Sequence, residues 1–462
     1  MRLTFAFTSY LLISFVAVNL LVVSSCNKIH LETSPPVKDT AVVLPAPPGL
    51  AGQPNIILIL ADDIGYEVPA FNGGQSYNTT NLDAMAAGGL RFTNCFASAS
   101  SSPSRFMLTT GKYNFRNYTK WGVMNPSETT IANLLHNAGY TTCVSGKWQF
   151  DGGDASIKAL GYDKYCVWDA FKTGDEEEAE FGSSYKDPAI YQNGTYLGTD
   201  SVLTGAYGVD VFNQYVTDFI DSNKSHPFFI YYPIPIAHAP FSPVPGDPKY
   251  TDWISKRGKS DTTFFPSMVN YMDKAIGDII NKVKSAGLES NTVILFVSDN
   301  GTPSTISSTY KNRKVTGGMG TSNIYGTHVP MLAYCPGSVA TGTCSSFIDF
   351  TDFLPTIVGL ANTQMPAGFV TDGQSFRNQL FQSSFPGRTY LYSYFFPHPE
   401  YPNSLEREYV QDSLYKYYDG GYGFFNVVTD PYEQSKLDGG SLTDDQQRLI
   451  SGFRKVIDSI HP

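Results

Sequence analysis

Short, continuous apolar segments that alternate with amphipathic ones constrain the fold of this 462-residue chain more than any other feature. The apolar runs occupy residues 55–61, 141–145, 227–232, 292–298 and 329–334. Runs of this length without polar alternation are typical of strands buried on both faces. Helical periodicity appears between them, at residues 129–138, 209–222 and 266–286. The pattern predicts an α/β fold in which a large, mostly parallel sheet is sandwiched by helices.

The pattern changes after about residue 347. Residues 408–417 and 423–428 alternate as antiparallel strands do, and residues 443–460 have the periodicity of a closing helix. We therefore expect a large N-terminal catalytic α/β domain at 54–346 and a smaller C-terminal α+β subdomain at 347–462.

The N-terminus has the features of an export signal. Arg2 precedes an apolar run at 10–23, and small residues then lead to Cys26. Small residues before a cysteine resemble the bacterial lipobox, in which that cysteine is lipidated. We expect a lipoprotein signal peptide at 1–25, a Pro-rich flexible tether at 26–53, and an exported protein anchored through Cys26 at the periplasmic or cell surface. A plain transmembrane anchor is the alternative, since the run is nearly long enough to span a bilayer.

Charge and cysteine content exclude several classes of protein. A net charge of −10 argues against a nucleic-acid partner, which would need a basic surface. Removing Cys26 leaves five of the six cysteines, so no complete disulfide framework is evident, although Cys335 and Cys344 could close a short loop. No cysteine or histidine spacing indicates zinc. The acidic run at 175–180 is typical of a solvated loop.

Polar side chains follow two of the predicted strands directly. Asp62 and Asp63 come after the run at 55–61, and Asp299 and Asn300 come after the run at 292–298. Ligands of open parallel sheets bind beyond the carboxyl ends of the strands. Three carboxylates and one amide oxygen suit Ca²⁺ or Mg²⁺. Each pair alone could equally be a turn or a helix cap, but two pairs at matching strand ends favour a metal site.

The segment 101–111, SSPSRFMLTTG, lies between these pairs. Pro103 and the apolar residues after it predict a helix that begins near Pro103. A residue at a helix start faces free N–H groups that favour an anion, and Arg105 adds a charge that can hold sulfate or phosphate oxygens. Ser101 is therefore placed to attack an anionic ester. A Ser-rich loop that only caps the helix is the alternative.

This segment resembles the sulfatase signature Cys/Ser-x-Pro-Ser-Arg-x-x-Leu-x-Thr-Gly in its serine form. Further blocks are similar to that family in the same order, and the resemblance covers the chain from Pro54 onward. The blocks are residues 54–66, 80–94, 139–148, 237–240, 414–418 and 425–433. The resemblance implies the fold of the alkaline-phosphatase superfamily and the hydrolysis of sulfate esters, with a sulfated carbohydrate as the expected substrate.

The resemblance also implies roles for individual residues. A divalent cation, Ca²⁺ or alternatively Mg²⁺, would be held by Asp62, Asp63, Asp299 and Asn300. A maturase would oxidise Ser101 to formylglycine, whose hydrate attacks sulfur. Arg105 and Lys147 would offset charge in the transition state, and His238 would act as general acid toward the leaving alcohol.

Two departures from the family pattern stand out. Gln149 occupies a position where many members have histidine, and glutamine is no base at neutral pH. Met319 occupies the apparent position of a second active-site lysine. The candidate replacements for that lysine are nearby basic residues: Lys311, Arg313 or Lys314. His328 is expected to be structural.

Two other functions remain open at the level of sequence. A phosphodiesterase or phosphonate hydrolase of the same superfamily would share the anion and metal geometry. A lapsed sulfatase that only binds sulfated glycans would explain Gln149 and Met319.

Overall fold

The computed structural model describes residues 45, 50, 52–168, 185–198, 201–254, 259–401 and 403–461. The predicted signal peptide, almost all of the tether, the lipidation site at Cys26 and the acidic run at 175–180 lie outside the described residues. Within the described ranges, no helix combines the length and the apolar character that crossing a bilayer requires.

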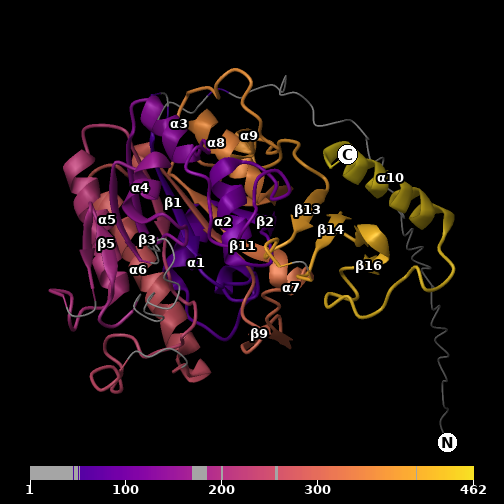
Figure 1. The fold of residues 1–462 in the computed structure, drawn as a ribbon, viewed down its shortest axis with the longest axis horizontal. Coiled ribbons are helices and arrows are strands. Elements are labelled where there is room, and N and C mark those ends of the chain that lie inside the picture. Colours follow the sequence, from indigo (N-terminus) through magenta and orange to yellow (C-terminus); the bar gives the residue numbers. More distant parts are fainter. Residues whose placement is uncertain are drawn as a thin grey trace, which may run out of the picture.

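A ten-stranded sheet forms the centre of the molecule (Figure 1). Its order is β12-β2-β11-β8-β1-β7-β3-β4-β5-β6. The strands are β1 (Asn55–Ala61), β2 (Leu90–Phe96), β3 (Thr141–Lys147), β4 (Lys164–Trp168), β5 (Ile190–Gln192), β6 (Thr195–Leu197), β7 (Phe228–Pro233), β8 (Thr292–Ser298), β11 (His328–Tyr334) and β12 (Gly342–Asp349).

The five central strands, from β8 to β4, are parallel to one another. β11 runs antiparallel to both of its neighbours, β8 and β2, while β12 pairs with β2 in parallel. β5 and β6 complete the other edge in antiparallel pairing. The prediction of a large, mostly parallel sheet is confirmed. Parallel pairing also places the carboxyl ends of β1 and β8 side by side, with Ala61 opposite Ser298.

Helices cover both faces because successive strand residues point to opposite sides. In β1, Ile57 and Ile59 pack against one layer of helices, while Leu58 and Leu60 pack against the other. The first layer contains α1 (Thr80–Gly88), α5 (Gly208–Asn223) and α6 (Phe265–Ser285). The second contains α2 (Ser101–Thr110), α3 (Ile131–Asn137), α4 (Gly153–Ala159), α8 (Phe353–Leu360) and α9 (Arg377–Phe381).

A four-stranded antiparallel sheet lies beside the large unit, with the closing helix α10 (Asp444–Ile460) against it (Figure 1). Its strands, in spatial order, are β13 (Leu391–Phe395), β14 (Arg407–Gln411), β15 (Tyr415–Tyr418) and β16 (Gly423–Asn426). Phe96 and Phe347 of the large sheet pack with Tyr409, Tyr418 and Phe425 of the small one, so a common apolar cluster joins the two.

Several predicted boundaries differ from the structure. The predicted strand at 408–417 is a hairpin, because the Asp412 carboxylate accepts the N–H groups of Leu414 and Tyr415 and turns the chain between β14 and β15. The expected domain boundary at 346/347 falls inside β12, which belongs to the large sheet. Helix α2 begins at Ser101, two residues before Pro103.

The five described cysteines are all free and buried, so Cys335 and Cys344 do not close a loop by a disulfide. Two smaller elements border the carboxyl edge of the large sheet. They are the hairpin of β9 (Ser307–Tyr310) with β10 (Arg313–Thr316), and the short helix α7 (Ile324–Thr327).

Candidate active site

The two polar pairs predicted from the sequence meet at the carboxyl ends of β1 and β8. The backbone N–H of Asp63 donates to Asp299 Oδ1 at 3.2 Å, and Asn300 Nδ2 donates to Asp63 Oδ1 at 2.7 Å. Asp62, Asp63, Asp299 and Asn300 are all buried. Asp63 has a φ of 63°, a left-handed conformation that a non-glycine residue adopts only where its surroundings impose it. The structure therefore brings the four candidate metal ligands together in one preformed cluster.

The carboxylates of this cluster repel one another. Burial raises the pKa of Asp63 well above its usual value, and the neighbouring Asp62 and Asp299 raise it further. Burial followed by the charge of Asp62 also raises the pKa of Asp299. A bound cation would relieve this repulsion and favour the ionised carboxylates.

Ser101 is the first residue of α2, and its side chain points into the cluster. Its Oγ donates to Asn300 Oδ1 at 3.1 Å and lies 3.4 Å from Asp62 Oδ1. At this position it faces the free N–H groups of the first helical turn, where a negative charge is favoured. Arg105 follows one turn later on the same helix face.

The guanidinium of Arg105 is fully buried beneath the carboxylates. Nη2 donates to Asp299 Oδ2 at 2.8 Å and lies 3.4 Å from Asp62 Oδ2, while Nη1 donates to the carbonyl of Lys147 at 3.2 Å. Burial alone would lower the pKa of Arg105, but Asp299, Tyr231 and Asp62 outweigh it and raise that pKa. Arg105 is thus permanently charged and held by two acids.

Lys147 and His238 approach from the strands on the other side of β1. Lys147 ends β3, and its Nζ lies 2.8 Å from Asp62 Oδ2. His238 follows β7, and one of its ring nitrogens lies within 4.8 Å of a carboxylate oxygen of both Asp62 and Asp63. Burial, and then the charge of Lys147, lowers the pKa of the partly exposed His238 to about 3. The imidazole is therefore neutral near pH 7.

The donor set fits a hard divalent cation. Asp62 Oδ2 is buried, and among the described residues no group donates a hydrogen bond to it, although Lys147 Nζ is within ion-pair distance. Three acidic side chains meet two basic ones, Arg105 and Lys147, so ionised carboxylates would leave an excess of negative charge that a cation can balance. Carboxylate and amide oxygens are the preferred ligands of Ca²⁺ and Mg²⁺.

The loop that carries Met319 is tied to this site by its backbone. Met319 donates its N–H to the carbonyl of Thr302 at 3.0 Å, and Gly320 donates to the carbonyl of Ala99, two residues before Ser101, at 2.8 Å. The small sheet braces the same loop, since Lys416 Nζ donates to the Ser322 carbonyl at 2.5 Å. Lys416 is itself paired with a buried acid, Glu433, at 2.7 Å.

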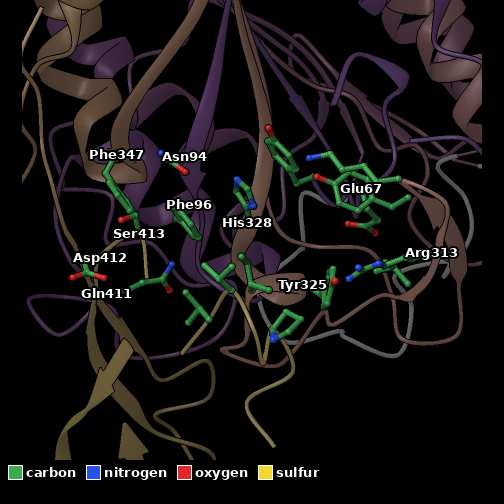
Figure 2. A pocket seen from close by; sticks show the side chains of 18 residues that line it. Glu67, Asn94, Phe96, Arg313, Tyr325, His328, Phe347, Gln411, Asp412 and Ser413 are labelled. Carbon is green, nitrogen blue, oxygen red and sulfur yellow. The ribbon is translucent and has the colours of Figure 1, made fainter. Parts of the chain in front are cut away.

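The basic residues proposed to replace a lysine at Met319 lie elsewhere. Lys311 and Arg313 are exposed at the β9–β10 hairpin and line a cavity of about 530 Å³ between the large and small sheets. Figure 2 shows His328 in the middle of this cavity, with Glu67 and Arg313 on one side and Gln411 and Asp412 on the other. None of the eight candidate site residues lines it.

His328 has a packing role in the structure. Its ring stacks on Tyr66 at a centroid distance of 3.8 Å and on Phe96 at 4.8 Å, and Nε2 lies 2.9 Å from the carbonyl of Thr93. Burial lowers its pKa to about 4. A neutral, stacked imidazole of this kind holds β11 against β2.

Sequence reasoning missed several residues that shape the site. Ser298 and Thr302 fix the turn after β1, because their hydroxyls accept the N–H groups of Ile64 and Gly65, each at 3.0 Å. Tyr231 lies close enough to Arg105 to raise its pKa. Ser298 and Thr302 could have been found from the sequence, because they are polar residues beside Asp299 and Asn300 at the end of β8. Tyr231 could not, because its sequence context is that of any core residue in a strand.

Comparisons with known proteins agree with this geometry. Residues 54–363 match the family model described as Sulfatase. Arylsulfatase G of Rattus norvegicus is 28% identical over 88% of this chain and 86% of its own length. N-acetylgalactosamine-6-O-sulfatase of Bacteroides thetaiotaomicron is 26% identical over 77% of this chain and 85% of its length. The solved structure of BT4656 in complex with its substrate D-glucosamine-2-N,6-O-disulfate is similar in fold, with a TM-score of 0.69 at 18% identity over 88% of this chain and 98% of that chain.

Proposed function

The chain belongs to the sulfatase family and is a sulfuric ester hydrolase, and on that premise we propose that it desulfates a carbohydrate through a formylglycine made from Ser101. We further propose that the four oxygen-donor residues, Asp62, Asp63, Asp299 and Asn300, hold Ca²⁺, with Mg²⁺ as the alternative.

One observation carries this proposal: Ser101 opens α2 and directs its Oγ into the carboxylate cluster, 3.1 Å from Asn300 Oδ1. A nucleophile at this point would attack an ester group that is held between the cation ligands, Arg105 and Lys147. The helix start and these two cations favour the anionic sulfate in that place.

The two groups that the family implies would supply the following chemistry. A divalent cation supplies positive charge that polarises sulfate oxygens. Formylglycine, as its hydrate, supplies one hydroxyl that attacks sulfur and a second whose deprotonation later releases sulfate.

The chain's own residues position and stabilise the reacting ester. Arg105 is fixed by Asp299, so its orientation requires no reorganisation when charge develops on the sulfate. Lys147 Nζ forms an ion pair with Asp62 at 2.8 Å but has no hydrogen bond of good geometry among the described residues, so an N–H group can turn toward a sulfate oxygen. Asn300 keeps Asp63 oriented through its amide.

We propose that His238 is the general acid that gives a ring proton to the leaving alcohol oxygen. Burial and the charge of Lys147 lower its pKa to about 3. An anionic sulfate bound beside the ring would raise this pKa toward the range that a general acid needs. Ca²⁺ prefers oxygen ligands to imidazole, so we do not count His238 among the residues that would hold the cation.

Sulfated sugars are the substrate class that the relatives support. One relative is named for the removal of a 6-O-sulfate from N-acetylgalactosamine, and one solved neighbour contains a disulfated glucosamine. For this chain we propose a sulfated carbohydrate, without a choice of sugar.

Mass spectrometry of the tryptic peptide 92–105 from protein made in its own host tests the proposed nucleophile. A peptide two hydrogens lighter than its coded mass, with the loss mapped to Ser101, is the expected result. It would also demonstrate a maturase in that host. An unmodified Ser101 would remove the nucleophile and contradict the mechanism.

Substrate profiling separates sulfatase chemistry from that of a phosphodiesterase or phosphonate hydrolase. We expect faster turnover of an aryl sulfate than of the matched aryl phosphodiester and phosphonate, since the Ser101–Gly111 signature is that of sulfatases. The reverse order would overturn the assignment of the natural ester.

Replacing Met319 by lysine tests whether the missing cation limits the rate. Because the Met319 backbone is fixed beside Ala99 and Thr302, Met319→Lys is expected to raise kcat/KM on a sulfated sugar. Met319→Leu is the matched control. An unchanged or lower kcat/KM would show that the loop no longer serves catalysis.

The sequence of the first 26 residues supports a proposal on location. We propose that the protein is exported and anchored to a membrane through a lipid on Cys26. Incorporation of a labelled fatty acid into the parent but not into Cys26→Ser is the expected result, and equal labelling of both would contradict it.

A further inference from the structure

Three aromatic rings form a short series on two loops, one of which contacts the start of α2. Trp121 stacks on His398 with a centroid distance of 4.8 Å and an interplanar angle of 20°. His398 lies 5.8 Å from Tyr401, at 39°. Trp121 and His398 are half-buried, and Tyr401 is 61% exposed. We call these three residues the aromatic track.

The inner end of the track is joined to the active site by hydrogen bonds. Gly122, next to Trp121, donates its N–H at 2.9 Å to the Oγ of Ser102, the neighbour of the nucleophile. The carbonyl of Gly122 accepts the N–H of Asp151 at 2.6 Å. Asp151 follows Gln149 and Lys147, so the loop that carries Trp121 is tied both to the start of α2 and to the segment after Lys147.

Glu400 fixes the rings relative to one another. Its Oε2 accepts the backbone N–H of Trp121 at 3.3 Å, and its Oε1 lies 3.2 Å from His398 Nδ1. Tyr118 Oη donates to the carbonyl of Pro397 at 2.9 Å and ties the same two loops together again. One loop joins α2 to α3 and the other joins β13 to β14, so the large and small sheets both build the track.

The three rings contribute little to the stability of the fold. None of the three rings belongs to the buried clusters that hold the sheets together. Rigid aromatic rings that stay partly open to solvent on loops near an active site are typical of ligand-binding surfaces. The apolar C–H face of a sugar ring packs on such a surface, while the sugar hydroxyls remain in water.

We infer that the aromatic track binds the sugar rings next to the one that carries the scissile sulfate. The substrate is then a sulfated oligosaccharide or polysaccharide, in preference to a monosaccharide sulfate. This inference rests on the proposed function, because Ser101 and its cluster define where the sulfated sugar lies.

Binding without turnover gives the first test. In a Ser101→Ala background, which prevents maturation, affinity electrophoresis through gels containing κ-carrageenan, chondroitin sulfate or heparin measures retention of the folded protein. The parent is expected to be retarded by at least one polymer. Tyr401→Ala and Trp121→Ala should each weaken that binding about threefold to tenfold, as loss of one stacked ring does.

Two control variants make this result specific. Tyr401→Phe keeps the ring and should bind as the parent does. Tyr196→Ala removes another exposed tyrosine, 47% exposed on the far edge strand β6, and should also bind as the parent does. No retention of the parent by any of the three polymers, or equal retention of parent, Tyr401→Ala and Trp121→Ala, would overturn the inference.

Kinetics on the matured enzyme give the second test. Tyr401→Ala should raise KM for a sulfated oligosaccharide several-fold more than it raises KM for an aryl sulfate, and kcat should change little. Equal changes in the two KM values would overturn the inference. Weaker binding by Tyr401→Ala in a protein that releases no sulfate would refute the proposed function alone, whereas sulfate release with unchanged ring variants would refute the track alone.

Discussion

The protein buries two clusters of carboxylates with basic partners, and the two clusters differ in the groups that contact the carboxylate oxygens. At the active site, Asp62 Oδ2 has ion-pair contacts with Lys147 and Arg105 but accepts no hydrogen bond within the described part of the chain. The cluster also includes Asp63 and Asp299, whose pKa values are raised by burial and mutual repulsion.

The second cluster lies at the end of β12, where Asp349 and Asp352 meet Arg388. Backbone N–H groups donate to three of its four carboxylate oxygens. Thr351 donates to Asp349 Oδ1 at 2.8 Å, and Gln374 donates to Asp352 Oδ1 at 2.6 Å. Asp352 Oδ2 accepts the N–H of Asp349 at 2.9 Å, and Arg388 pairs with Asp352 Oδ1 at 2.6 Å. Burial raises the pKa of Asp349 to about 7, with Asp352 adding to the shift and Arg388 opposing it.

Burial and repulsion therefore do not distinguish a binding site from a structural one in this protein. The distinguishing property is what the oxygens contact. A cluster whose oxygens mostly accept backbone N–H groups holds the chain together, whereas a cluster that keeps a buried oxygen without a hydrogen bond can take a ligand.

The largest expected effect is on kcat and comes from Ser101, because the second cluster has no counterpart of this residue. Ser101→Ala should lower kcat by at least about 10⁴-fold, since it removes the proposed nucleophile. Sulfate release, measured by ion chromatography, checks this, and the melting temperature should change little. Ser100→Ala is the matched control and should retain activity; a Ser101→Ala protein that still turns over would refute the role of Ser101.

Arg388→Met should have the largest effect on stability. It leaves Asp349 and Asp352 buried without their cation, which costs about 3–5 kcal/mol of unfolding free energy. Chemical denaturation of the parent and the variant measures the difference. A loss below about 1 kcal/mol would mean that the backbone N–H groups alone suffice to hold these two carboxylates.

A divalent cation should stabilise the protein through the first cluster only. At a Ca²⁺ concentration of 100 Kd, the melting temperature should rise by roughly 2–4 °C, because binding adds about 2.7 kcal/mol to the unfolding free energy. Asp62→Asn should abolish this rise, whereas Asp349→Asn should leave it intact. A rise that survives Asp62→Asn would place the cation elsewhere.

The smallest expected effect is a pH-dependent one at Asp349. Its pKa is about 7 in the folded protein and near 4 when unfolded, so the folded state binds more protons between these values. The unfolding free energy of the parent therefore falls as pH rises from about 4 to 7. Asp349→Asn removes this loss and should gain on the order of 1–3 kcal/mol over the parent between pH 5 and pH 8. A difference independent of pH would contradict the raised pKa.

The position of the candidate metal cluster was predictable because its signals are local. Asp62 and Asp299 each follow a run of buried residues, and parallel pairing of those runs brings them together without further information. The helix that begins at Ser101 was also predicted from neighbouring residues, namely Pro103 and the apolar residues after it. The residue-by-residue roles remain predictions, since they come from resemblance to the family.

Features that the sequence did not predict depend on contacts between segments that are distant in the chain. Nothing in the sequence of β11 shows that it runs antiparallel between β8 and β2, because pairing direction is decided by the connections and not by the strand itself. The strand that ends at Lys147 is longer than predicted. It can continue through residue 146 because that residue is glycine, whereas a Cβ there would lie 2.1 Å from the carbonyl oxygen of Pro233. Trp121 and His398 meet only after two separate sheets have packed.

The burial of Ser101 has a consequence for how the protein is made. Only 6% of this residue is exposed, and it sits in the first turn of a helix whose other residues are buried as well. If Ser101 is oxidised as proposed, the packed helix would keep a modifying enzyme away from this side chain. The oxidation would then precede folding, and the speed of folding would set the time available for it.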